Sequence, residues 1–155
     1  MTTESKLNWL VNDFIKLLET LSAEQKGNWG VMKAQQMVEH MSYSVRHANG
    51  RDIKTLLTPP ENLERIRAFA LSDREFRENT KNIELPETAL PLSNPSMTAA
   101  IEELKTELKE FKNYFQQNKD ATLMNPFFGE LNFEQWVHLL HKHAMHHARQ
   151  FNLID

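Results

Sequence analysis

The feature that most constrains this chain is an uninterrupted stretch near its C-terminus, residues 132–152, with the sequence NFEQWVHLLHKHAMHHARQFN. It contains no proline and no glycine, and Asn132 followed three residues later by Gln135 predicts an N-cap with a capping box. Five of the seven histidines of the chain fall within it. We therefore predict one long helix that starts near Phe133 and carries most of the imidazoles of the protein.

Helical spacing divides these histidines between faces. A broad apolar face follows steps of three and four residues and is formed by Trp136, Leu139, Leu140, His143, His147, Gln150 and Phe151. His138 and His141 fall on the opposite side, and His146 lies on the flank. Two histidines four residues apart on a buried face are how one helix offers two imidazoles to one metal ion. The same spacing also suits core histidines held by hydrogen bonds, or a wet histidine-rich surface.

Composition restricts the kind of site and the partners. The 155 residues are enough for one domain with a sizeable core, and the complete absence of cysteine excludes disulfides and thiolate metal ligands, so nitrogen and oxygen must hold any metal. The net charge is −3 with no basic stripe, which argues against nucleic acid as a partner. The N-terminal sequence MTTESKLNWL does not resemble a signal peptide, and no run approaches the about 18 apolar residues of a membrane span. We expect a cytoplasmic protein.

Apolar periodicity predicts three further long helices. The first covers residues 4–21, and the second covers residues 32–48 and ends at Asn49-Gly50, a good C-terminal signal. The third begins after Ser96, which can act as its N-cap. Its charged face carries opposite charges spaced to pair, and we interpret that face as a solvated surface without a site.

The remaining segments are predicted to connect the long helices. We expect a short helix near residues 63–70 after two prolines, a further helical turn over 72–79, an extended irregular crossing over 81–95, and a loop over 118–131. No segment alternates with period two. The predicted class is all-α: one domain over residues 1–155, built as a four-helix bundle with a long irregular and helical crossover between its second and third helices.

A bundle can bring the second and fourth helices side by side, and His40 would then converge with His143 and His147. Three imidazoles on a divalent metal leave at least one position open, as in catalytic rather than structural zinc sites. Imidazole suits zinc, nickel, copper or iron, so the ligand set does not choose among them. Considered alone, a histidine such as His40 is more often a polar residue at the border of the core with its hydrogen bonds satisfied.

Four further side chains are candidates to orient the ligands or to line a pocket. Gln36 lies one turn before the histidine of the second helix, and Gln150 follows the last histidine by three residues. His47 and His146 are candidates because they lie on or beside the same helix faces. The two glutamines are equally consistent with exposed positions.

Three segments resemble a known family. They are Trp29-Gly30-Val31-Met32 leading into Gln35-Gln36-Met37-Val38-Glu39-His40-Met41, then Asn125-Pro126-Phe127-Phe128-Gly129, and above all residues 143–151, HAMHHARQF. They resemble the DinB/YfiT-like superfamily of metalloenzymes, in particular a branch of it with no assigned function. In that resemblance His40 matches the first ligand histidine, and His143, His147 and Gln150 match the HxxxH pair and the glutamine that follows it.

The resemblance implies a four-helix bundle with a three-histidine metal site, most often with nickel or zinc, and frequent formation of dimers. Characterised relatives include transferases and isomerases that use a low-molecular-weight thiol, such as bacillithiol, mycothiol or glutathione. The other histidines, His138, His141, His146 and His47, lie outside the family pattern. Because of His146, a ligand pair of His143 with His146 stays open as an alternative.

The leading functional hypothesis is a metal-dependent enzyme acting on a small molecule, in which the metal activates either a thiol for transfer or a water for hydrolysis. No catalytic acid or base is identified, since Glu39 adjoins His40 but should point elsewhere. The alternatives are a non-catalytic bundle that binds a metal or small ligand, and a bundle whose histidines are purely structural.

Overall fold

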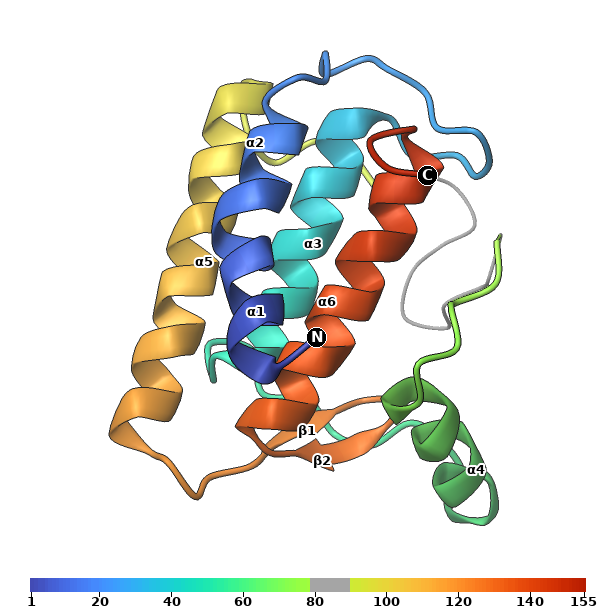
Figure 1. Ribbon diagram of the computed structural model, residues 1–155, viewed down its shortest axis with the longest axis vertical. Coiled ribbons are helices and arrows are strands. Elements are labelled where there is room, and N and C mark those ends of the chain that lie inside the picture. Colours follow the sequence, from blue (N-terminus) through green and yellow to red (C-terminus); the bar gives the residue numbers. More distant parts are fainter. Residues whose placement is uncertain (79–89) are drawn as a thin grey trace.

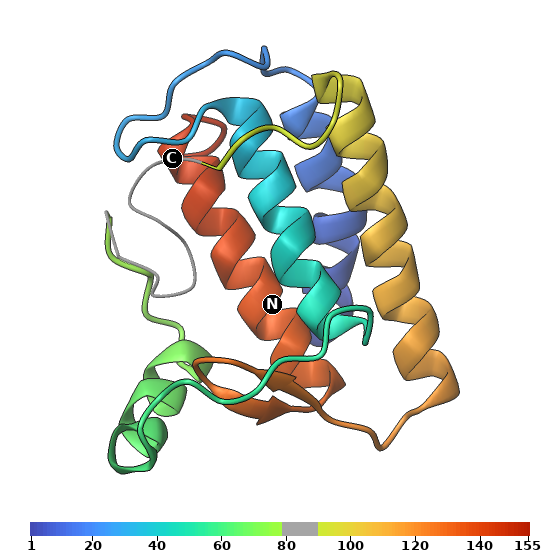
Figure 2. The same ribbon diagram turned by 180° about the vertical axis from the view of Figure 1, so that it is seen from behind.

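The structure, a computed structural model, describes residues 1–78 and 90–155 and is mostly helical, as predicted. Its elements are α1 (Thr3–Asn8), η1 (Trp9–Asp13), α2 (Phe14–Leu18), α3 (Ala34–Ala48), α4 (Pro60–Leu71), α5 (Met97–Gln117), β1 (Leu123–Asn125), β2 (Gly129–Leu131) and α6 (Phe133–Gln150). The first three follow one another without a break and form an N-terminal rod. Figure 1 shows this rod, α3, α5 and α6 side by side, with the β-hairpin and α4 at one end. From behind, α3 lies between α5 and α6, against both of which it packs (Figure 2).

The N-terminal rod differs from the predicted continuous α-helix over residues 4–21. It ends at Leu18, and it contains one π-helical turn, closed by a hydrogen bond from the Phe14 N–H to the Trp9 carbonyl. The wider turn lets the Trp9 ring stack on Phe14 at 5.3 Å and meet the edge of His141 at 5.2 Å. Apolar spacing could not reveal it, because a stripe of leucines at steps of three and four tolerates one wide turn.

Helix α3 begins at Ala34, two residues later than predicted, and ends where predicted, next to Gly50 in the left-handed region (φ +80°). Its C-terminal end is clamped to α5 by Glu107, whose buried carboxylate accepts hydrogen bonds from Arg46 (3.1 Å), Asn49 (3.0 Å) and Arg51 (2.9 Å). This network fixes how α3 is placed against α5 and therefore where α3 carries His40.

The caps predicted for the last two helices are confirmed. Ser96 Oγ accepts the N–H of Ala99 at 3.1 Å. Asn132 Oδ1 accepts the N–H of Gln135, and Gln135 Oε1 accepts the N–H of Asn132, both at 3.0 Å, which is a complete capping box. Helix α6 starts at Phe133, as expected, and runs to Gln150.

The predicted loop over residues 118–131 was wrong in part, because it contains a two-stranded antiparallel hairpin in which Leu123 pairs with Leu131. The turn is built by Asn125, whose Oδ1 accepts the N–H groups of Phe127 (2.8 Å) and Phe128 (3.1 Å). Strands of three residues are too short to produce a detectable period of two, so periodicity could not predict them.

The predicted short helix after the two prolines is confirmed as α4, but the helical turn expected over 72–79 is absent from the described residues 72–78. The reason lies in Lys142 of α6, whose ammonium donates to the carbonyls of Phe69 (2.8 Å), Ala70 (3.3 Å) and Ser72 (3.2 Å). These contacts satisfy the last carbonyls of α4 and end the helix. Of the predicted crossing over 81–95, residues 90–95 are neither helix nor strand, and the rest lies outside the described residues.

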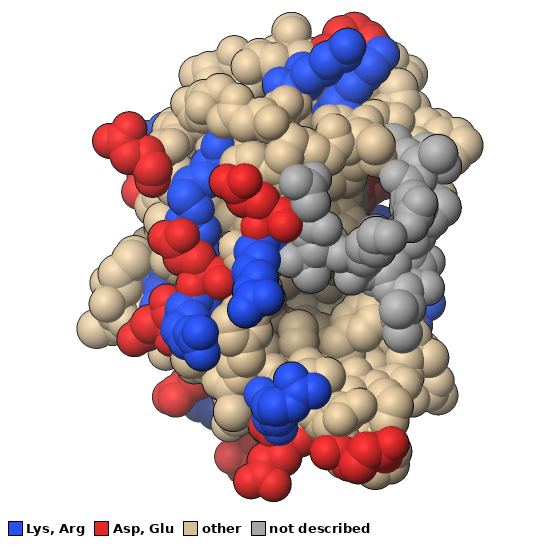
Figure 3. Space-filling model, turned by 90° about the vertical axis from the view of Figure 1, so that its right-hand side faces the viewer, with Lys and Arg blue, Asp and Glu red and all other residues tan. Residues whose placement is uncertain are grey.

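Within the described ranges no helix is both long and apolar enough to cross a membrane. On the face shown in Figure 3, acidic and basic side chains are interleaved rather than gathered by sign. That face therefore offers no basic patch of the kind that binds nucleic acid.

We expect Glu107→Ala to lower the free energy of unfolding by about 2–3 kcal/mol, because it leaves Arg46 and Asn49 without their buried acceptor. Urea unfolding followed by circular dichroism measures this loss. The matched control is Glu110→Ala on the exposed side of the same helix, which should change stability by no more than about 0.5 kcal/mol. Equal effects of the two substitutions would refute the clamp.

Candidate metal centre

Three histidines from two helices meet at one point. The Nε2 atom of His40 on α3 lies 3.0 Å from Nε2 of His143 on α6, which in turn lies 2.9 Å from Nε2 of His147. All three ligand atoms are within 4.8 Å of one another. Nitrogens bound to one tetrahedral zinc ion at about 2.0–2.1 Å would lie roughly 3.3 Å apart, so small shifts of the rings would accommodate such an ion.

The orientation of His147 is fixed from behind by Gln150. The Nδ1–H of His147 donates to Oε1 of Gln150 at 2.7 Å, and Nε2 of the same amide donates to the carbonyl of Trp29 at 2.8 Å. The second bond prevents the amide from flipping, so its oxygen must face the imidazole. His147 is thereby held in the tautomer whose Nε2 carries a lone pair directed at the other two histidines.

The ring nitrogens of the cluster cannot all be satisfied by one another. With the lone pair of His147 Nε2 fixed, a proton on Nε2 of His143 can serve that contact or the one to His40, but not both. In addition, Nδ1 of His40 is buried and has no hydrogen-bond partner among the described residues. A cation among the three Nε2 atoms would satisfy all three lone pairs at once, so the donor set fits a metal better than it fits a proton.

Burial keeps the three imidazoles neutral, which is the form that binds metals. It lowers the pKa of His40 to about 4, with smaller contributions from His146 and His47. Burial also lowers the pKa of His143 and of His147 well below the usual value, and the neighbouring imidazoles add to the effect. The cluster is therefore available as a set of ligands without first losing protons near pH 7.

Two glycines allow the loop before α3 to approach Gln150. A Cβ atom on Gly27 would lie 2.8 Å from Cγ of Gln150, and one on Gly30, which has φ +79°, would lie 2.9 Å from its amide nitrogen. The intervening Asn28 N–H also donates to the Gln150 carbonyl at 2.7 Å. The loop thus closes over the residue that orients His147, and side chains at these two glycines would push it away.

Aromatic rings flank the cluster on the α6 side. His146 meets the edge of Trp29 at 5.5 Å and of Phe76 at 6.2 Å, and Phe76 also lies 6.4 Å from the ring of His143. Sequence reasoning did not single out Phe76. It follows α4 in a segment without regular structure, where periodicity carries no information about which side chain faces inward. His146 itself points toward these rings, and its own ring contacts His147 at 5.2 Å.

Two of the other candidates lie elsewhere. Gln36 forms the capping box of α3 through the Lys33 N–H (2.8 Å), and its amide donates to the Leu90 carbonyl at 3.1 Å. His47 is buried near the C-terminal end of α3, where Nε2 lies 3.5 Å from a carboxylate oxygen of Asp52. Neither has a direct contact with the three-histidine cluster in the described structure.

The remaining histidines of α6 lie on its other side, as predicted from the spacing. Nε2–H of His138 donates to the Ser72 carbonyl at 2.8 Å, and its Nδ1 accepts from Lys6 at 2.9 Å. His141 packs against Trp9, and burial, with Lys6 and His138 adding, lowers its pKa to about 4. These residues attach α1 and the end of α4 to α6.

Glu39 points away from the cluster, as expected. Its carboxylate accepts the N–H groups of Ser93 (2.9 Å) and Asn94 (3.0 Å) and an amide N–H of Gln35 (3.2 Å). Burial acts to raise the pKa of this carboxyl, but the hydrogen bonds from Ser93, Gln35 and Asn94 leave it below its usual value. Glu39 therefore anchors the segment before α5 and is not placed as a base at the histidines.

Comparison with known proteins identifies the family of the chain. The family model of the DinB superfamily matches residues 6–151, nearly the whole chain. The chain belongs to the DinB superfamily. No curated protein and no solved structure matches it. For this DinB-superfamily chain the match and the cluster together support a three-histidine group that could hold a metal ion.

We expect the metal-free protein to lose stability as the pH falls from 6.5 toward 4. The unfolded chain takes up protons on His40, His143 and His147 below their ordinary pKa of about 6.5, whereas the folded chain resists protonation until lower pH. The loss from His40 alone should be on the order of 1–3 kcal/mol. Urea unfolding at several pH values measures it, with His40→Leu as the comparison. If His40→Leu lost as much stability on acidification as the wild type, His40 would not be one of the groups that cause the loss.

Proposed function

We propose that this DinB-superfamily protein is a metal-dependent enzyme that acts on a small molecule through a divalent cation held by His40, His143 and His147. The observation that carries the proposal is the convergence of three Nε2 lone pairs that one proton cannot satisfy. A bound cation would supply Lewis-acid chemistry, lowering the pKa of a thiol or water in its open position. The reaction would accordingly be S-transfer with a low-molecular-weight thiol, or hydrolysis.

The finer architecture belongs to the same proposal. We assign the rod, α3, α5 and α6 as the four helices of a bundle of the DinB/YfiT type, with the segment between α3 and α5 as its crossover and residues 1–155 as a single domain. Following the resemblance to the DinB/YfiT-like superfamily, we propose zinc or nickel as the bound metal. We further propose a cytoplasmic homodimer.

The chain's own residues supply orientation rather than acid or base chemistry. Gln150 keeps His147 in the binding tautomer, and Trp29 holds the amide of Gln150. The rings of Phe76 and His146 flank the cluster on the α6 side. A thiol transferase needs no further base, because a thiolate is already the nucleophile.

A second candidate function is a non-catalytic module that binds a metal or a small ligand. It is favoured by the same donor set together with the absence of a placed acid or base at the cluster among the described residues. Incubating metal-loaded protein with low-molecular-weight thiols and electrophiles separates the two. Turnover that a chelator abolishes supports the enzyme, and metal binding without turnover supports the module.

Purified protein should contain close to one equivalent of a transition metal, and His40→Ala or His143→Ala should reduce this content at least tenfold, because two imidazoles bind a divalent ion far more weakly than three. Elemental analysis after dialysis measures the stoichiometry. His138→Ala is the matched control, since it removes a histidine of the same helix that points away from the cluster. Full metal retention in the first two variants would defeat the site.

Gln150→Leu should keep the stoichiometry but weaken metal binding about 10–100-fold, because His147 then loses the acceptor that fixes its tautomer. Competition with a chromophoric chelator measures the affinity. Gln36→Leu is the control, since that glutamine serves the cap of α3 and should leave the affinity unchanged. If both substitutions had the same effect, the relay through Gln150 would not be what orients the ligand.

A further inference from the structure

A groove runs between the N-terminal rod and α5, remote from the histidine cluster. The rod packs against α5 through α2, and the two diverge toward the end of the molecule that carries the hairpin (Figure 1). Two adjoining hollows of about 270 and 260 Å³ lie in this gap, and Lys112 and Gln116 line both of them. None of their lining residues belongs to the histidine site.

The floor of the groove is apolar. It is formed by Val11 and Leu108 in one hollow and by Leu7, Phe115 and Phe133 in the other. Leu108 and Phe115 belong to the buried core of the molecule. Since Leu108 is only 2% and Phe115 only 3% exposed, the apolar side chains that a partner can reach are the half-buried Leu7, Val11 and Phe133.

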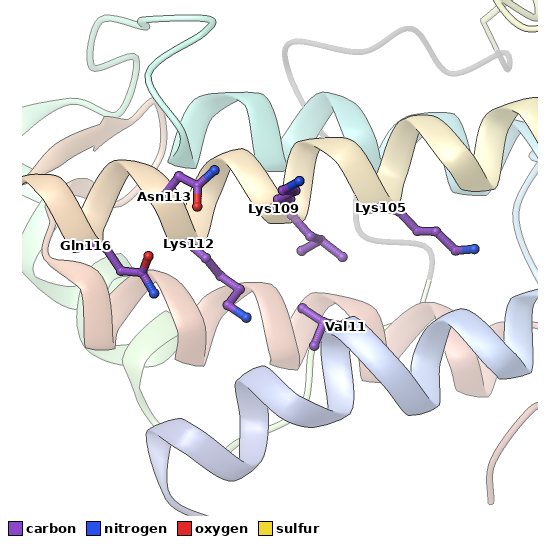
Figure 4. A pocket seen from close by; sticks show the side chains of 7 residues that line it. Val11, Lys105, Lys109, Lys112, Asn113 and Gln116 are labelled. Carbon is purple, nitrogen blue, oxygen red and sulfur yellow. The ribbon is translucent and has the colours of Figure 1, made fainter.

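The α5 side of the groove is basic. Lys105, Lys109 and Lys112 follow one another at steps of four and three residues, so they lie on one face of α5, and Lys119 lines the second hollow from the turn after the helix. Figure 4 shows the side chains of the first three on the groove side of α5, with Val11 across from them. Lys105 pairs with Glu102 at 2.9 Å and with Glu19 at 3.8 Å.

The other three lysines have no ion-pair partner among the described residues. The pairing of opposite charges expected on this helix from its sequence is therefore limited to its N-terminal half. Toward the open end of the groove, positive charge over an apolar floor is left without a complement.

From this pattern we propose that the groove docks an acidic amphipathic helix of a partner protein. The apolar side chains of the floor would pack against the apolar face of the helix. Lys109, Lys112 and Lys119 would form ion pairs with acidic residues beside that face. From Lys105 to Gln117, where α5 ends, the helix extends for roughly 18 Å, which matches about three turns of such a helix.

The shape of the groove favours this partner over other anions. A small ligand is usually buried over most of its surface, which two half-open hollows do not provide, whereas a docked helix keeps its polar face in water. A nucleic-acid backbone has no apolar face to place on Val11 and Phe133.

The test uses the full-length protein and a labelled synthetic peptide of about 18 residues, in which leucine recurs every three or four positions and glutamate flanks that stripe. Fluorescence anisotropy should show saturable binding that weakens with salt. Lys109→Glu with Lys112→Glu should weaken binding about tenfold or more. The control, Lys16→Glu with Lys26→Glu, changes the net charge equally at exposed lysines outside the groove and should change binding less than about threefold.

Two further arms identify the ligand. A peptide of the same composition with its leucines scrambled should bind at least about tenfold more weakly, and amide shifts induced by the striped peptide should map to residues 7–11 and 105–119. Equal binding of the scrambled peptide would show that binding depends on charge alone and would overturn the proposal. Absence of binding by the striped peptide, or lysine-dependent binding of phosphatidylglycerol vesicles in its place, would overturn it as well.

Discussion

The histidine cluster depends on one hydrogen-bond relay. The Trp29 carbonyl accepts from the amide of Gln150, and the oxygen of that amide accepts from His147. Because a carbonyl can only accept, the direction of the relay is fixed at its outer end, and it leaves the inner imidazole with a lone pair toward His143. The glycines on both sides of Asn28-Trp29 follow from this, since the loop must approach Gln150 more closely than any side chain would allow.

The position of His40 in the cluster depends on how helix α3 is held in the molecule. His40 comes from α3, which is clamped to α5 at its far end by Glu107 and held nearer its beginning by Glu39, whose carboxylate accepts the N–H groups of Ser93 and Asn94. Both carboxylates lie on α3 or across from it, and neither reaches the imidazoles. Charge in this protein therefore positions the helices, whereas the candidate metal site is built from neutral donors.

Much of this could be predicted from sequence because the signals were local. The cap at Asn132 and the end of α3 next to Gly50 follow from local signals, and the pairing of His143 with His147 follows from spacing on one helix. Their convergence with His40 was expected because a bundle can place two helices side by side and because of the family resemblance. What was missed depends on contacts between distant segments. The end of α4 is set by Lys142 from α6, and the hairpin is too short to produce a periodic signal. The place of Phe76 beside the histidines also arises only in three dimensions.

The π-helical turn at Trp9–Asp13 has a consequence for how this rod could have arisen. Such a turn holds one residue more than an α-helical turn, so a single inserted amino acid can be absorbed there without breaking the helix. The residues before it, which include Leu7, are rotated about the helix axis relative to Phe14 and Leu18 by the turn that one extra residue contributes. A one-codon deletion within 9–13 should therefore leave a continuous helix but turn its first two turns away from their present neighbours.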